Sequence, residues 1–144
     1  MDRYDKIKLD NQICFPLYAL SREIIKLYKP FLDKYDLTYT QYITMLVIWE
    51  EEKITFKDLG KRLHLDSGTL TPVLKKLESM ELINKYRSKE DDRIVIVEIT
   101  EKGKLLKEEI LEVPEQIYCK LNIEAEELIA IKRQLDDILA QISE

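Results

Sequence analysis

The sequence is poor in residues on which several common kinds of functional site depend. It holds three glycines, two cysteines and one histidine in 144 residues. The scattered glycines form no phosphate-binding loop, and no GxGxxG, P-loop or GxSxG motif occurs. The lone histidine, without a CxxC or HExxH motif, argues against a metal site. Two distant cysteines do not make a structural disulfide framework. We therefore expect neither a metal nor another cofactor.

Long apolar runs are also missing. None approaches the roughly 20 residues needed to span a bilayer. The charged start MDRYDKIKLD is not followed by the apolar segment of a signal peptide. We therefore expect a cytoplasmic protein with no membrane association. A hydrophobic content of 45% is enough for the core of one domain over residues 1–144.

The net charge of −5 taken alone argues against a nucleic-acid-binding protein. The charge is uneven, however. Acidic residues crowd 108–115 and 124–137, whereas 57–93 is mixed to basic. An acidic chain with a local basic surface is compatible with this distribution.

Apolar residues at spacings of three and four predict a first helix from about Asp10 to Tyr28, ending before Pro30. Pro16 is expected to kink its first turns or to delay the regular helix. The stripe predicted to be buried consists of Ile13, Leu17, Leu20, Ile24 and Leu27.

Capping patterns predict the next helices. Thr38 and Gln41 form a capping box before a helix that ends near Glu50. Its core-facing residues are predicted to be Tyr42, Met45, Leu46 and Trp49.

Two shorter helices follow. Thr55 caps one that runs through Leu63, and Asp66 or Ser67 caps one that runs to about Met80. The second is predicted to turn Leu70, Val73, Leu74 and Leu77 inward.

Two strands come next, Leu82–Tyr86 and the β-branched run Arg93–Ile99, with the polar tip SKEDD between them. Thr100 is predicted to cap a long helix through about Lys120, and Asn122 to cap the last helix. A three-four alternation in the last helix indicates a helix–helix seam formed by Leu128, Ile131, Leu135, Ile138 and Ile142.

This order predicts a mainly α fold with a small β-hairpin wing. Residues 38–99 are expected to form a winged helix-turn-helix DNA-binding region. The flanking segments 8–30 and 100–144 are expected to be dimerisation helices. An alternative is that they pack only within the chain, as in a helical bundle.

The fourth helix is the candidate for reading double-stranded DNA. Small hydroxyl residues at its start let a helix approach the major groove closely, although they also serve simply as caps. The predicted DNA contacts from this helix are Asp66, Ser67, Thr69, Thr71, Lys75 and Lys76. His64, in the turn before it, is expected to face solvent, where it can reach a phosphate, rather than to sense pH.

The hairpin supplies further charged residues. Arg93 is predicted to enter a minor groove, oriented by Asp91, whereas the alternative is a merely solvated turn. A symmetric dimer would place two such units on a palindrome, about one helical turn apart. Basic wing candidates also include Lys85, Arg87 and Lys89.

Cys14 lies beside the apolar stripe, and there it is either inert packing or a reactive thiol. Tyr18 is four residues later on the same helix face. Tyr28 is fourteen residues later, roughly 21 Å along a straight helix. If Tyr28 contacts a Cys14, that cysteine must belong to an antiparallel partner.

The segments LDNQICFPLYALSREIIKLYKPFLDKYDLTYTQY and LDSGTLTPVLKKLE, with the wing KEDDR, resemble the MarR superfamily, and within it the OhrR organic-hydroperoxide sensors. The resemblance implies a homodimeric repressor that binds a palindromic operator when reduced. Oxidation of Cys14 by an organic hydroperoxide would release it. Tyr18, Tyr28 and Tyr39 match the tyrosines that hydrogen-bond the reactive sulfur.

Cys119 corresponds in some members of that group to a second cysteine that closes an intersubunit disulfide. The alternatives are an idle thiol here, or a reaction of Cys14 with a small cellular thiol. Two rival functions stay open: a regulator that responds to a small aromatic ligand, and a thiol peroxidase with Cys119 as resolving cysteine. An enzyme would leave the hydroxyl-rich helix and the wing without a purpose, so we expect a non-enzyme.

Overall fold

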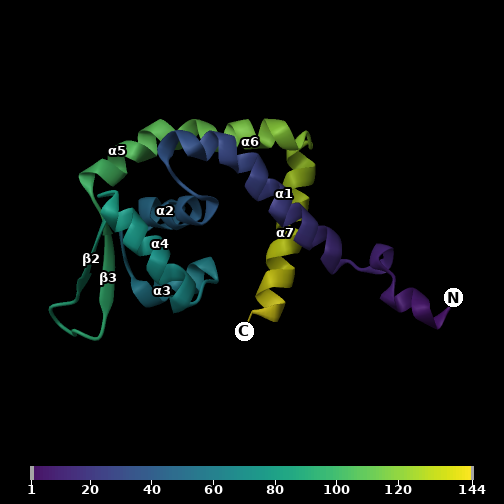
Figure 1. The fold of residues 1–144 in the computed structure, drawn as a ribbon, viewed down its shortest axis with the longest axis horizontal. Coiled ribbons are helices and arrows are strands. Elements are labelled where there is room, and N and C mark those ends of the chain that lie inside the picture. Colours follow the sequence, from purple (N-terminus) through teal and green to yellow (C-terminus); the bar gives the residue numbers. More distant parts are fainter. Residues whose placement is uncertain (1, 144) are drawn as a thin grey trace. The chain divides into compact units, whose positions relative to one another are not determined.

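The computed structural model describes residues 2–143. It separates into two compact units, the first ending at Leu111 and the second beginning at Glu112. Figure 1 shows the order of the elements. The helices and strands of the first unit are α1 (Cys14–Leu32), α2 (Tyr39–Glu51), β1 (Lys53–Thr55), α3 (Phe56–Leu63), α4 (Ser67–Ser79), β2 (Ile83–Arg87), β3 (Val95–Ile99) and α5 (Glu101–Glu109). The second unit holds α6 (Val113–Leu121) and α7 (Ala125–Ile142).

The caps predicted for the helices of the first unit are confirmed. The Thr38 hydroxyl accepts a hydrogen bond from the Gln41 amide at 3.3 Å, and the Gln41 side chain accepts one from the Thr38 amide at 3.0 Å. The Thr55 and Asp66 side chains cap α3 and α4 by accepting a hydrogen bond from the amide three residues later. Thr100 accepts from the amide of Gly103 at 3.0 Å and begins α5. Local hydrogen bonds therefore define where these helices start.

Helix α1 begins later and ends later than predicted. Two 3-10 turns, Arg3–Ile7 and Leu9–Asn11, precede it, and its first residue is Cys14 instead of Asp10. Pro16 occupies the first turn, where a missing N–H costs no intrahelical bond, so the predicted delay of the helix is confirmed. The predicted stop at Tyr28 is wrong, because α1 continues through Pro30 to the buried Leu32.

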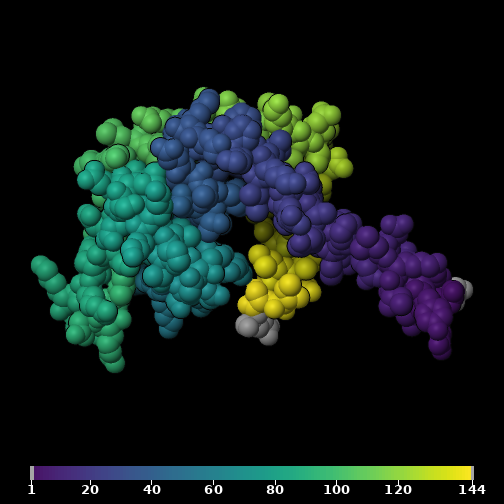
Figure 2. All heavy atoms as spheres, in the orientation of Figure 1, coloured from purple at the N-terminus to yellow at the C-terminus, as the bar shows by residue number. Residues whose placement is uncertain are grey.

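The strands form a three-stranded antiparallel sheet in the order β1-β3-β2. Ile83 pairs with Ile99 and Arg87 with Val95, which sets the wing register. The sequence analysis did not anticipate β1, which pairs Ile54 with Val97 and makes β3 the central strand. In the space-filling view the hairpin tip projects beside α3 and α4 (Figure 2).

The core of the first unit packs α4 against α2, α3 and the sheet. Leu70, Leu74 and Leu77 are fully buried as predicted, whereas Val73 is half-buried. In α2 the prediction for Leu46 is wrong, since 43% of it is exposed. The other core-facing residues of α2 are confirmed as Tyr42, Met45 and Trp49.

Helix α5 lies close to this core at Gly103. The buried Trp49 indole N–H donates to the carbonyl of Gly103 at 2.8 Å. A Cβ on Gly103 would lie 2.5 Å from the Leu82 carbonyl oxygen. Only glycine fits there without movement.

The single helix predicted from Thr100 to Lys120 is wrong. Helix α5 ends at Glu109, a 3-10 turn follows over Ile110–Glu112, and α6 begins at Val113. In a continuous helix Pro114 would have no N–H for the Ile110 carbonyl and its ring would crowd that carbonyl, which explains the break. The cap predicted at Asn122 is also wrong, because this residue ends α6 in the left-handed conformation with φ 54°.

The apolar stripe of α1 is not buried within the chain, contrary to prediction. Ile13 is 74% exposed, and Leu17 and Leu20 are also exposed, while Ile24 and Leu27 are half-buried. The predicted seam of α7 is exposed at Ile131, Leu135, Ile138 and Ile142. Among residues 2–143, no helix has both the length and the apolar character of a membrane span.

Candidate functional site

The outer face of α4 presents the predicted polar residues. The Asp66 carboxylate accepts from the Thr69 amide at 2.8 Å, and this bond lowers the pKa of Asp66. The Thr71 hydroxyl donates to the Ser67 carbonyl at 2.7 Å. All six candidates on this helix are exposed: Asp66, Ser67, Thr69, Thr71, Lys75 and Lys76.

In the wing, Asp91 orients Arg93 as predicted. The guanidinium donates from Nε to one carboxylate oxygen and from Nη2 to the other, both at 3.0 Å. These bonds lower the pKa of Asp91 and raise that of Arg93. Arg87 crosses the hairpin and donates to the Asp92 carbonyl at 2.8 Å. Lys89 is exposed at the tip.

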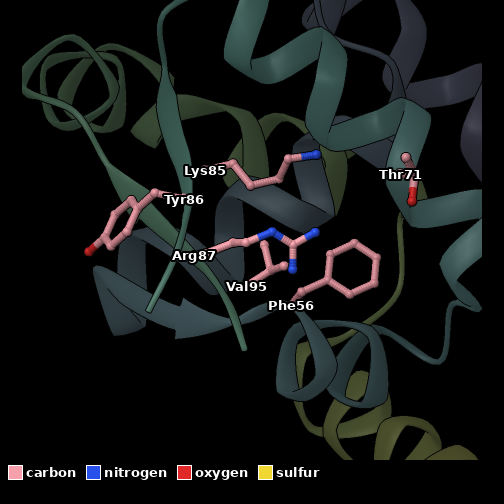
Figure 3. A pocket seen from close by; sticks show the side chains of 6 residues that line it. All are labelled: Phe56, Thr71, Lys85, Tyr86, Arg87 and Val95. Carbon is pink, nitrogen blue, oxygen red and sulfur yellow. The ribbon is translucent and has the colours of Figure 1, made fainter. Parts of the chain in front are cut away.

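A cavity of about 370 Å³ opens between α4 and the wing. In Figure 3 the Arg87 guanidinium lies near Val95 and the ring of Phe56, and Thr71 stands on the α4 side. Lys85 and Arg87, both on β2, give this hollow two cations. A concave cationic surface beside a helix that offers hydroxyl groups suits a DNA phosphate. His64 is exposed in the turn before α4, as expected.

Cys14 is exposed at the first position of α1, where the helix dipole favours an anion. Tyr18 follows one turn later and is 58% exposed. Its hydroxyl accepts a hydrogen bond from Arg22 at 3.1 Å. The sequence analysis missed Arg22, although its spacing of four from Tyr18 is a signal for such a pair. The second thiol, Cys119 on α6, is exposed too.

A cluster of three tyrosines forms where the far end of α1 meets α2. The ring centroids of Tyr28 and Tyr39 are 4.9 Å apart, and those of Tyr28 and Tyr42 are 5.6 Å apart. Burial raises the pKa of Tyr39, so its phenol stays protonated and able to donate. Tyr42 was predicted only as core, yet it lies three residues after Tyr39 and supports both other rings.

The structure therefore brings Tyr28 and Tyr39 together, but not with Cys14 of the same chain. Helix α1 is unbroken from Cys14 to beyond Tyr28. Fourteen residues at 1.5 Å each separate these two positions by about 21 Å.

The comparisons with known proteins agree with this architecture. The model of the family described as transcriptional regulator SarA/Rot matches residues 26–110. The organic hydroperoxide resistance transcriptional regulator of Bacillus subtilis (strain 168) is 47% identical over 138 residues, which cover 96% of this chain and 94% of that protein.

Two structures of AbfR, a protein from Staphylococcus epidermidis, are also similar. Reduced AbfR bound to DNA has a TM-score of 0.80 at 30% identity, covering 99% of this chain and all of that one. Disulfide-formed AbfR has a TM-score of 0.67 at 29% identity, covering 95% and 96%. The B. subtilis relative is named as a transcriptional regulator, and reduced AbfR is bound to DNA. This chain belongs to the SarA/Rot family of MarR-like winged-helix transcriptional regulators and is a relative of the organic hydroperoxide regulator of B. subtilis.

Proposed function

We propose that the protein is a homodimeric, redox-sensing transcriptional repressor. The reduced dimer binds a palindromic operator, and oxidation of Cys14 by an organic hydroperoxide releases it. The observation that carries the proposal is the separation of about 21 Å between Cys14 and Tyr28 on one unbroken helix. Phenols from Tyr28 and Tyr39 reach a sulfur only if a second chain packs antiparallel and supplies the partner subunit's Cys14.

The exposed apolar residues support a dimer. A contiguous apolar surface on a soluble chain marks an interaction site. The α1 stripe and the α7 seam are two such surfaces, and both lie outside the winged region. In the proposed dimer the partner covers them, so the sensing thiol and the subunit contact belong to one structure.

The chemistry follows from the thiolate. Its sulfur attacks the terminal oxygen of the hydroperoxide ROOH, and the O–O bond breaks. Sulfur is oxidised to sulfenic acid, while the leaving alkoxide takes a proton from water and becomes an alcohol. Phenol O–H groups donate hydrogen bonds to the thiolate and stabilise it without adding a charge.

Cys119 supplies the second step of the proposal. Its thiol attacks the sulfenic sulfur of the partner subunit's Cys14, giving a disulfide and water. The disulfide-formed structure of AbfR supports this step by similarity. A disulfide needs sulfur atoms about 2 Å apart, so its closure rearranges the dimer and changes the spacing of the two wings.

The test is a band-shift of operator DNA with reduced and cumene-hydroperoxide-treated protein, run beside non-reducing electrophoresis. We expect oxidised wild type to leave DNA as a covalent dimer, and the C14S variant to stay bound. C119S distinguishes the two thiol modes, because release without a covalent dimer indicates a small-thiol partner. Release of C14S under peroxide would contradict the proposal.

A further inference from the structure

Arg22 has an unusual partner. Arginine commonly pairs with carboxylates, but no ion pair between described residues includes Arg22. Its Nη1 instead donates to the neutral Tyr18 phenol oxygen at 3.1 Å. The guanidinium carbon lies 5.6 Å from the centroid of the same ring. The charge of Arg22 is therefore directed at one tyrosine.

The direction of the side chains relates this pair to the thiol. Cys14, Tyr18 and Arg22 follow one another at intervals of four residues and form one strip along α1. Long side chains on a helix lean towards its N-terminus. The hydrogen bond to Tyr18 shows Arg22 reaching back by one turn. The turn that precedes Tyr18 in the same direction is that of Cys14.

The hydrogen-bonding capacity of the phenol adds a second argument. A tyrosine hydroxyl has one O–H donor and also accepts. Here the oxygen accepts from Arg22, and the O–H donates to no acceptor among the described residues. A cationic donor on the oxygen polarises the O–H and strengthens the next hydrogen bond in the chain.

We propose that Arg22 is a positioning residue for the peroxide reaction. It holds the Tyr18 phenol with the O–H directed at the Cys14 sulfur, and so increases the thiolate fraction and the rate of attack on the hydroperoxide. This role rests on the proposed function of Cys14. Arg22 acts through Tyr18 and touches neither the peroxide nor the sulfur.

The test measures how fast iodoacetamide alkylates Cys14 as a function of pH, in a C119S background that leaves one thiol. R22M removes the charge but keeps the stem, and R22K restores a cationic donor. K26M is the matched control, because Lys26 is an exposed cation on the same helix whose partner is Glu23. Asp10, before the helix, and Glu23 are unchanged in every variant.

We expect R22M to move the pH midpoint upwards and to slow alkylation and cumene hydroperoxide reaction at pH 7 by a factor of about three to ten. R22K should recover most of the rate, and K26M should match wild type. Y18F should reproduce R22M, and the double variant should add nothing to Y18F. An R22M profile like that of K26M, or additive effects in the double variant, would overturn the proposal.

The assay separates this inference from the proposed function, since alkylation is read without DNA. A shift of the alkylation pH profile in R22M, found while peroxide never releases the wild-type protein from DNA, would support the role of Arg22 and contradict the proposed function. Circular dichroism melting checks that each variant folds.

Discussion

The carboxylate of Asp91 and the guanidinium of Arg93 are joined by two parallel hydrogen bonds, each 3.0 Å long. The Arg93 side chain nevertheless remains 86% exposed. The cation at the wing is therefore both oriented and accessible, and for the proposed contact with a DNA groove we expect this to lower the entropy lost on binding. Since the pKa of Asp91 is lowered, the carboxylate stays ionised below its ordinary range. Its contribution to stability is lost only as the pH falls through that lowered value.

Replacement of Asp91 with alanine should weaken operator binding, because Arg93 keeps its charge but loses its orientation. We expect a loss of roughly tenfold for the operator and a smaller loss for unrelated DNA, measured by fluorescence anisotropy at fixed salt. E90A removes the same charge from the tip without touching the pair, and should not weaken binding. Equal behaviour of D91A and E90A would show that orientation does not matter.

The G103A variant should be strongly destabilised. The new Cβ would meet the Leu82 carbonyl oxygen at 2.5 Å and the Ile99 side chain at 2.8 Å. Overpacking of this kind costs about 1–3 kcal/mol in urea unfolding. G68A is the matched control, because its Cβ would meet only the Asp66 carboxylate at 3.4 Å. A G103A protein as stable as G68A would mean that the contact at α5 yields easily.

The stability of the protein should fall above pH 10 in a way that depends on Tyr39. Burial raises the pKa of Tyr39, so the folded state holds this proton more tightly than the unfolded chain does. Unfolding therefore becomes easier as the pH rises from about 10 through the raised value, and is unaffected below. Urea midpoints between about pH 9 and 11 should show the decline in wild type and in Y118F, and a smaller decline in Y39F. An identical decline in Y39F would contradict the assignment.

Ile138→Glu should prevent dimerisation. Ile138 belongs to the exposed seam of α7, and a carboxylate buried in a subunit contact has no partner to offset its desolvation. Analytical ultracentrifugation should find a monomer, and affinity for a palindrome should fall sharply. A140E adds the same charge on the opposite face of α7 and should remain dimeric. A dimeric I138E protein would favour helices that pack only within the chain.

Much of the fold followed from short-range patterns. The caps at Thr38 and Asp66 were predictable because each involves residues three apart. Strand β1 was not, because three residues carry no pattern and its partner β3 lies about forty residues later. The exposure of Ile13 could not be predicted from the sequence either. An apolar stripe has the same pattern whether it packs within its own chain or against a second copy.

The same distinction between short-range and long-range contacts applies to the candidate site. The Asp91–Arg93 pair spans two residues and was predicted, with the geometry now observed. Tyr28 and Tyr39 were named through a family resemblance, and their contact is a property of how α1 meets α2. Arg22 was missed because a charged residue on an exposed helix face is usually only solvated.

The bond from the Trp49 indole to the Gly103 carbonyl has a mechanical consequence. It fastens the first turn of α5 to the hydrophobic interior of the winged region. Because Gly103 has no side chain, the backbone of α5 lies close to the backbone of Leu82. Helix α2 packs against both α5 and α4. We therefore expect a small tilt of α5 to reach α4 and the hairpin through this core, and so to change the direction of both elements proposed to bind DNA.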